Sequence, residues 1–192
     1  VWPGDMAYDA GRGLMCQVNV GGDNGIYCWN PNTGAVVDSI TGSFAWTTIS
    51  QRGLAYRPDD DTFYIGGWNQ GILYHVKGLS YPDAGAIISQ CTPPDGNISG
   101  LAWNPAFNVI WAATNTATDT IYRLNPDNCA VAATLPHPSP GFHGAGLDYV
   151  IQNLHAQWRT PCPPPERERI EEIEAWLQDN HRGEPFVILD DE

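Results

Sequence analysis

The stretch Gly53-Leu54-Ala55-Tyr56-Arg57-Pro58 decides the fold, because the chain repeats it. It returns as Gly100-Leu101-Ala102-Trp103-Asn104-Pro105, and fainter copies lie at Met6-Ala7-Tyr8-Asp9 and Gly146-Leu147-Asp148-Tyr149. The spacings are 48, 47 and 46 residues, measured between positions 7, 55, 102 and 148. A regular period of this size is typical of repeat architectures.

Each repeat contains four short apolar runs, rich in β-branched and aromatic residues and separated by Gly, Asn, Asp and Pro. No run has the 3.6-residue period of a helical repeat. Four antiparallel strands in about 45 residues are typical of a β-propeller blade, so we expect an all-β fold. The expected strands are 6–9, 14–20, 25–29 and 35–40, then 54–56, 62–68, 72–76 and 86–91, then 101–103, 109–114, 120–124 and 130–135.

The turn Asn30-Pro31-Asn32-Thr33-Gly34, followed by Ala35-Val36-Val37, resembles the P-x-T-G turn of the YVTN and quinoprotein-like propellers. Residues 13–29 also resemble propeller regions attached to secreted bacterial proteins, some of them subtilisin-like peptidases. The resemblance covers about residues 4–149. It implies a propeller that binds or scaffolds and carries out no catalysis.

The repeats predict a partial propeller over residues 1–149, with blades at about 5–52, 53–99 and 100–145 and a fourth beginning at 146. Three blades and one strand do not close a ring, which typically takes four to eight blades. Two explanations stay open: a homo-oligomer completes the ring, or the chain was cut from a larger protein. A first residue that is Val rather than Met favours the second.

The acidic residues change type near residue 150. Residues 1–150 contain twelve Asp and no Glu, whereas residues 151–192 contain seven Glu and three Asp. Asp favours turns and Glu favours helices, so the change indicates a structural boundary. The net charge of −13 argues against a nucleic-acid partner, which would require a basic surface. No stretch approaches the roughly 18 consecutive apolar residues of a membrane span.

Beyond the boundary we expect a Pro-rich linker over residues 150–165 and an acidic helix–strand tail over residues 166–192. The tail resembles the end of haloacid dehalogenase-like phosphatases, with Arg169 near the start of a helix and Phe186-Val187-Ile188-Leu189 leading into Asp190-Asp191. The resemblance implies that Asp190 and Asp191 help to hold Mg²⁺. An acidic, solvated chain end is the alternative interpretation.

The chain departs from that family at the nucleophile. In the family, the nucleophile lies in an Asp-x-Asp sequence at the end of a hydrophobic strand. The superficial match here is Asp59-Asp60-Asp61-Thr62-Phe63, which falls in the hairpin turn of the second repeat. The other repeats fill this turn with Ala, Gly and Asn, so we expect a structural role and predict no catalytic residues. The lead hypothesis therefore includes no cofactor, and Mg²⁺ belongs to the phosphatase alternative.

The cysteine positions favour a disulfide-bonded protein outside the cytoplasm. Cys16 and Cys28 lie on neighbouring expected strands, and we pair them; we also pair Cys91 with Cys129. Cys162 is then left over. No pair has the spacing of a zinc site.

Three other groups of residues are of types that bind ligands in other proteins, but structural roles account for them here. The sequence Gly21-Gly22-Asp23-Asn24-Gly25 suits a hairpin turn better than a Ca²⁺ loop. The five His have no spacing that forms a metal face. Five Trp at comparable places in the repeats are expected to pack the blades, with a ligand cage as the alternative: Trp29, Trp46, Trp68, Trp103 and Trp111.

We therefore predict a binding or scaffolding propeller module of a secreted or surface protein, with an unknown protein or small-molecule ligand. The alternatives are a Mg²⁺-dependent phosphatase of the haloacid dehalogenase type, or its inactive remnant, and a structural segment of a larger secreted peptidase.

Overall fold

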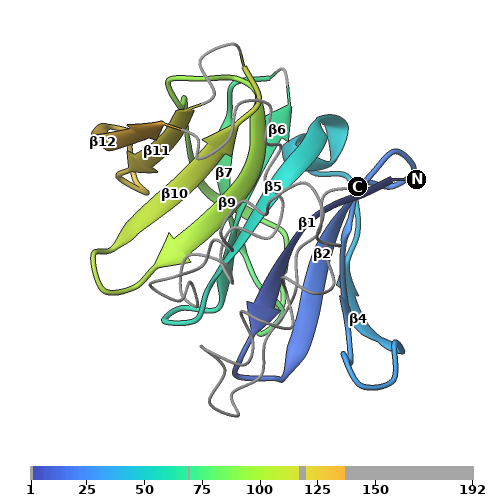
Figure 1. The fold of residues 1–192 in the computed structure, drawn as a ribbon. Helices are drawn as coiled ribbons and strands as arrows, with labels where there is room; N and C mark the ends of the chain where they lie inside the picture. The colour runs from blue at the N-terminus through green and yellow to red at the C-terminus, as the bar shows by residue number, and fades with distance from the viewer. Residues whose placement is uncertain (1, 69, 117–119, 137–192) are drawn as a thin grey trace, which may run out of the picture. The chain divides into compact units, whose positions relative to one another are not determined.

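The computed structural model describes residues 2–68, 70–116 and 120–136, which lie within a compact unit formed by residues 1–152. These residues form three four-stranded antiparallel sheets, each built from strands consecutive in the chain (Figure 1). Sheet 1 contains β1 (Trp2–Asp9), β2 (Leu14–Val20), β3 (Ile26–Trp29) and β4 (Val36–Ile40). Sheet 2 contains β5 (Ser50–Arg57), β6 (Thr62–Trp68), β7 (Leu73–Lys77) and β8 (Ile87–Cys91). Sheet 3 contains β9 (Ile98–Asn104), β10 (Val109–Thr114), β11 (Thr120–Leu124) and β12 (Val131–Pro136).

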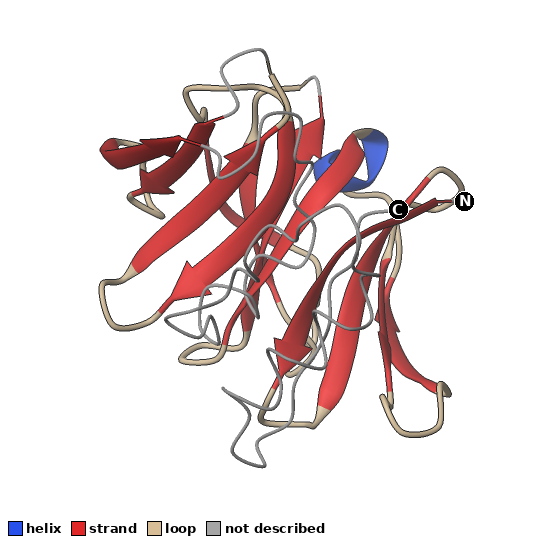
Figure 2. Cartoon of the chain, in the orientation of Figure 1, coloured by secondary structure: helices blue, strands red, loops and turns tan. Residues whose placement is uncertain are grey.

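The expectation of an all-β chain with four strands in each repeat is confirmed for the described residues. The largest differences lie in the first strand of each repeat, which begins four residues earlier than expected in sheets 1 and 2 and three residues earlier in sheet 3. A single 3₁₀ turn, η1 (Ala45–Thr48), was not anticipated; it precedes β5 and is drawn in blue in Figure 2. No described helix is long and apolar enough to cross a membrane. The expected fourth blade, linker and tail lie outside the described residues.

The three sheets pack face against face, and their first strands β1, β5 and β9 lie side by side (Figure 1). One core lies between sheets 1 and 2 and contains Cys16, Val18, Leu54 and Phe63. A second core lies between sheets 2 and 3 and contains Tyr64 and Leu101, among others. The fourth strands β4, β8 and β12 are largely exposed. Sheet 2 is therefore buried on both faces, as the blades of a stack require.

Asp5 joins the first strands of all three sheets through one fully buried carboxylate. Its Oδ2 accepts hydrogen bonds from the backbone N–H of Leu54 in β5 at 3.0 Å and of Leu101 in β9 at 2.8 Å. Its Oδ1 accepts the N–H of Met6 at 2.9 Å. Met6, Leu54 and Leu101 hold the same position in the three repeats, so equivalent donors converge on one acceptor group.

The residues equivalent to Asp5 in the other repeats are Gly53 and Gly100. A Cβ at Gly53 would lie 2.7 Å from Leu101 Cγ and 2.9 Å from Ile98 Cγ2, distances that real contacts do not reach. Glycine at this place lets β5 approach β9 closely, while the Asp5 side chain supplies the acceptor for their backbone donors.

Replacing Asp5 by Ala is expected to leave the N–H groups of Leu54 and Leu101 buried without this acceptor. Each buried, unsatisfied donor costs roughly 1–3 kcal/mol, so we expect a loss of about 2–6 kcal/mol in the free energy of unfolding. Urea denaturation followed by tryptophan fluorescence measures it. Asp38→Ala is the matched control, because the exposed Asp38 accepts a hydrogen bond only from the adjacent Ser39 N–H among those found in the described residues. Equal losses in the two variants would contradict the role of Asp5.

Candidate functional site

The turn between the first and second strands has the same backbone form in all three repeats. The residue before the second strand is left-handed in each: Gly13 has φ 69°, Asp61 has φ 53° and Asn108 has φ 50°. Gly, Asn and Asp tolerate this conformation better than other residues. The acidic sequence 59–61 therefore occupies a conventional turn, in agreement with the structural role expected for it.

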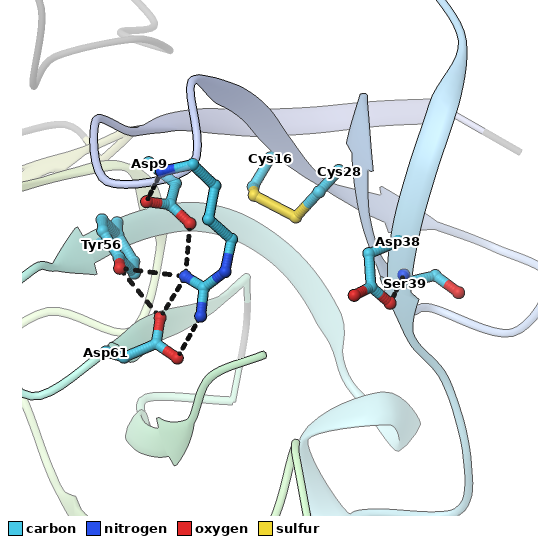
Figure 3. Close-up of a disulfide and its surroundings, with 8 residues drawn as sticks. Asp9, Cys16, Cys28, Asp38, Ser39, Tyr56 and Asp61 are labelled. Atoms are coloured by element: carbon cyan, nitrogen blue, oxygen red, sulfur yellow. Dashed lines mark hydrogen bonds and ion pairs between the residues drawn. A yellow bond between two sulfur atoms is a disulfide. The ribbon is translucent and has the colours of Figure 1, made fainter. Parts of the chain in front are cut away.

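Arg12 in this turn of sheet 1 binds carboxylates from two sheets (Figure 3). Its guanidinium donates to Asp9 at 2.6 Å and to both oxygens of Asp61 at 2.8 and 2.9 Å. Asp61 also accepts hydrogen bonds from the Tyr56 hydroxyl at 2.8 Å and the Ser80 backbone N–H at 2.6 Å. This ion-pair network connects sheet 1 to sheet 2, and it occupies Asp61, one of the two aspartates of the superficial nucleophile match. The other, Asp59, is exposed.

The network shifts the pKa values of its members. Burial alone would raise the pKa of Asp61, but hydrogen bonds from Arg12, Ser80 and Tyr56 outweigh it and hold that pKa well below its usual range. Burial, followed by the hydrogen bond to Asp61, raises the pKa of Tyr56. Asp61 therefore stays ionised and Tyr56 stays protonated at neutral pH, which suits a structural ion pair better than acid–base catalysis.

The interface between sheets 2 and 3 uses a second arginine in a similar way. The guanidinium carbon of Arg57 lies 4.8 Å from the ring centroid of Trp103, and the side chain donates to the Tyr64 hydroxyl at 3.3 Å. Trp103 holds the position that Tyr56 holds in sheet 2. At each of the two described interfaces an arginine of one sheet contacts the repeat aromatic of the next, because Arg12 also donates to the Tyr56 hydroxyl at 3.4 Å.

His75 in β7 is buried and is not placed for metal binding. Its ring stacks on Tyr64 with centroids 4.3 Å apart, and its Nε2 forms a hydrogen bond with the Thr62 hydroxyl at 2.8 Å. Burial lowers the pKa of His75, which keeps the ring neutral at physiological pH. The other four His lie outside the described residues, within which no group of three or more metal-binding side chains occurs.

The glycine-rich sequence 21–25 joins β2 to β3 as a hairpin turn. Asn24, with φ 52°, donates its side-chain amide to the carbonyl of Thr47 at 2.7 Å. The Asp23 carboxylate accepts the N–H of Gly25 at 3.2 Å and the hydroxyl of Tyr27. These contacts support the hairpin interpretation of this sequence.

Two disulfides join the cysteines that the sequence analysis pairs. Cys16 and Cys28 face each other on β2 and β3 within sheet 1 (Figure 3). Cys91 at the end of β8 bonds Cys129, in the turn before β12, and so connects sheets 2 and 3. Cys129 holds the left-handed position, with φ 59°, that Gly34 holds in the equivalent turn of sheet 1.

The tryptophans do not occupy comparable places in the repeats, so that part of the expectation was wrong, although Trp46 and Trp103 do pack the two cores between the sheets. Trp46 lies in η1, fully buried, and donates its indole N–H to the Gly85 carbonyl at 2.7 Å. Trp68 ends β6 beneath Arg52, whereas Trp103 and Trp111 lie on different strands of sheet 3. Trp29 ends β3 and lines an open pocket.

One face of sheet 1, here called the Tyr8 face, is open and rich in aromatic residues. It consists of Met6, Tyr8, Met15, Gln17, Asn19, Tyr27, Trp29 and Val36, which alternate with the residues buried against sheet 2. A shallow pocket of about 350 Å³ lies on it, lined by six residues: Gln17, Asn19, Tyr27, Trp29, Gly34 and Val36. This face was not predicted from the sequence, although the alternation of its residues with buried ones is visible there.

Asp190 and Asp191, the expected metal ligands, lie outside the described residues. Their role in binding Mg²⁺ therefore stays a prediction of the sequence.

Comparison with known proteins places the fold but not a family. No family model and no curated protein matches the chain. Among solved structures, the hydrazine synthase of Kuenenia stuttgartiensis matches with a TM-score of 0.51 and 13% identity over 72% of this chain and 37% of that chain. A chain of the mitotic checkpoint complex matches with a TM-score of 0.50 and 13% identity over 71% of this chain and 40% of that chain.

Both neighbours have folds of the β-propeller type. At this identity the likeness concerns the fold alone. The match spans less than half of either neighbour's length, so each of them contains a large part that has no counterpart in the aligned region of this chain.

The low pKa of Asp61 predicts that stability falls in acid. A carboxylate with a lowered folded pKa stabilises above its unfolded pKa, near 3.9, and that contribution is lost as pH falls toward the folded value. In Arg12→Met we expect lower stability at pH 7 and a shallower decline below about pH 4, because the folded pKa of Asp61 is no longer depressed by the guanidinium. Urea denaturation between pH 2 and 7 measures both.

Lys77→Met is the matched control for this experiment. It removes a cation whose partner is the exposed Asp83, and we expect a much smaller change at neutral pH. Stability curves of Arg12→Met and wild type that run parallel from pH 7 to pH 2 would contradict the assignment.

Proposed function

We propose that this chain is a non-catalytic binding or scaffolding module of the β-propeller type, belonging to a secreted or surface protein. The observation that carries the proposal is the Tyr8 face: an open, aromatic sheet surface on a scaffold whose two other sheet interfaces are tightly packed. The likeness to two propeller-type folds supports the scaffold part.

The polar clusters of the described residues support a structural interpretation over a catalytic one. Asp5 binds backbone donors of three strands, Asp61 binds Arg12, and His75 binds Thr62. In each case the reactive group is held by partners from the fold itself. None of the three has the combination of access and adjusted pKa that a general base or nucleophile requires.

The proposal extends to the propeller group and to the boundaries of the chain's parts. We propose that sheets 1–3 are blades of a YVTN or quinoprotein-like propeller over residues 1–149, followed by a linker at 150–165 and a helix–strand tail at 166–192. Closing a ring requires further blades, supplied by other copies or by a longer protein. The matching turns 30–34 and 125–129 support the repeat assignment, because both place a left-handed residue before the fourth strand and bond its N–H to the carbonyl four residues earlier.

A location outside the cytoplasm predicts that both disulfides form in the exported chain. Non-reducing peptide mapping should recover a Cys16–Cys28 pair and a Cys91–Cys129 pair. In the chain-entropy model, loops of 12 and 38 residues give about 3 and 4 kcal/mol. The double variant Cys16→Ala/Cys28→Ala should lose less stability than the double variant Cys91→Ala/Cys129→Ala, which opens the longer loop. Four free thiols among these cysteines would remove the support for export.

A phosphatase assay tests the proposal that the chain carries out no catalysis. The full chain with Mg²⁺ and p-nitrophenyl phosphate should release no phenolate above a buffer control. Turnover that disappears in Asp190→Asn, but persists in the matched variant Asp179→Asn, would overturn the proposal and support a phosphatase of the haloacid dehalogenase type. Turnover lost in Asp61→Asn would instead assign the reaction to the turn of sheet 2.

A further inference from the structure

The first strand of each sheet contains a β-bulge at the same position of the repeat. The pairing register shifts at residues 4–5 in β1, at Arg52 in β5 and at Ser99 in β9. A bulge changes the direction in which a side chain points, and bulges are frequent beside binding sites. The equivalent residues are Gly4, Arg52 and Ser99, so only the second repeat carries a long side chain here.

The other two repeats show that the bulge forms without an arginine. Gly4 has no side chain, and the Ser99 hydroxyl donates to the Ala113 carbonyl of its own sheet at 3.2 Å. The backbone geometry that the repeats share therefore does not explain why the second repeat places a guanidinium at this position.

The Arg52 guanidinium lies against two tryptophans from different sheets. Its carbon is 5.9 Å from the ring centroid of Trp2, at the start of β1, and 5.6 Å from that of Trp68, at the end of β6. Trp2 is 66% exposed, and Arg52 and Trp68 are partly exposed. We call these three residues the Arg52 cluster. Indole rings hold a guanidinium through its flat faces, which leaves the N–H groups at its edge for another partner.

The described residues supply no acceptor for this guanidinium. Arg52 forms no ion pair or hydrogen bond with them, and its Nε is buried without a partner. Arg12, Arg57 and Lys77, by contrast, each pair with an aspartate. Buried donors are normally satisfied, and the chain offers 22 acidic residues against 9 basic ones. A guanidinium held by two rings but given no acceptor is thus arranged to bind an anion from outside.

The charge of the chain selects the kind of anion. The planar fork of an arginine binds a carboxylate through two parallel hydrogen bonds. Phosphate has a similar geometry, but a chain with a net charge of −13 repels a doubly charged anion more strongly than a singly charged one. A carboxylate is therefore the better ligand for Arg52.

The residues next to Trp68 indicate what the carboxylate is attached to. Trp68 forms an isolated antiparallel bridge with Asn97. The N–H of Asn97 donates to one oxygen of Asp95 at 3.0 Å. Amide and carboxylate oxygens accept hydrogen bonds from hydroxyl groups, whereas the exposed ring of Trp2 offers a flat apolar surface. A pyranose ring has both hydroxyl groups and an apolar face, so a pyranose that carries one carboxylate matches the whole surrounding of Arg52.

We propose that the Arg52 cluster binds a uronic acid, with the guanidinium on its carboxylate and the indole rings of Trp2 and Trp68 against its ring. This inference goes beyond the proposed function, because it adds a ligand site whose three residues do not belong to the Tyr8 face. A single ion pair at a partly exposed site gives weak binding, so we expect a dissociation constant of about 1 mM for a monosaccharide.

Ligand-detected NMR titration of the full chain with sodium galacturonate tests the proposal. Galactose is the matched ligand, since it lacks the carboxylate, and it should bind at least about tenfold more weakly. Acetate or sulfate binding as tightly as galacturonate would reduce the site to a simple anion site and overturn the proposal. N-acetylaspartate binding more tightly than galacturonate would indicate an acidic peptide and would also overturn it.

Variants of the cluster test which residues bind the sugar. Arg52→Met should weaken galacturonate binding at least about tenfold, and Arg52→Lys, which keeps the charge but loses the planar fork, should give an intermediate loss. Trp2→Ala should also weaken binding. The matched control is Arg123→Met, because Arg123 likewise forms no ion pair within the described residues but has no cation–π contact with them, and binding should persist.

Urea denaturation of each variant shows whether it is folded. If Arg52→Met does not fold, Arg52→Lys and Trp2→Ala decide the question. A wild type that does not bind galacturonate, or equal binding by the wild type and the folded cluster variants, contradicts the assignment. None of these outcomes involves the Tyr8 face or the phosphatase assay, so failure of the sugar site is distinguishable from failure of the proposed function.

Discussion

The arrangement of the three sheets depends on one buried carboxylate, that of Asp5. First strands are sheet edges, and their backbone donors would otherwise face the crowded centre where β1, β5 and β9 meet. Two of the three repeats place glycine where Asp5 stands, so that the strands can approach, and only one supplies the acceptor. A strictly regular repeat could not both let the strands approach and supply the acceptor, because three carboxylates at this point would repel one another in a low dielectric.

The strands were predictable from sequence because each repeat has local apolar patterns bounded by turn residues. The bounds of four strands were predicted without error. Three of them are the second strands of their repeats, which are enclosed by clear hairpin signals: 14–20, 62–68 and 109–114. The first strands were underestimated because residues such as Gln51 are polar and yet buried by contacts from outside their own strand. Their true length is a property of the packed sheets.

The contacts that organise the candidate site were not predictable, because they join residues far apart in sequence. Arg12 and Asp61 are separated by 49 residues, and the sequence indicates only that each lies in a turn. The Tyr8 face was equally hidden, since the sequence shows that Tyr8, Tyr56 and Trp103 are equivalent but not that one of them lacks a neighbouring sheet. Repeat sequences indicate what positions share, whereas the exposure of the Tyr8 face is a difference between the first repeat and the other two.

The bond between Cys91 and Cys129 also determines how the chain responds to a pulling force. Tension applied through the chain on either side passes from β8 to β12 across the sulfur atoms, so β9, β10 and β11 carry none of it. The 38 residue steps between the two cysteines would otherwise contribute roughly 130 Å of extension. In an oxidising environment most of sheet 3 is therefore mechanically shielded, and reduction would release that length.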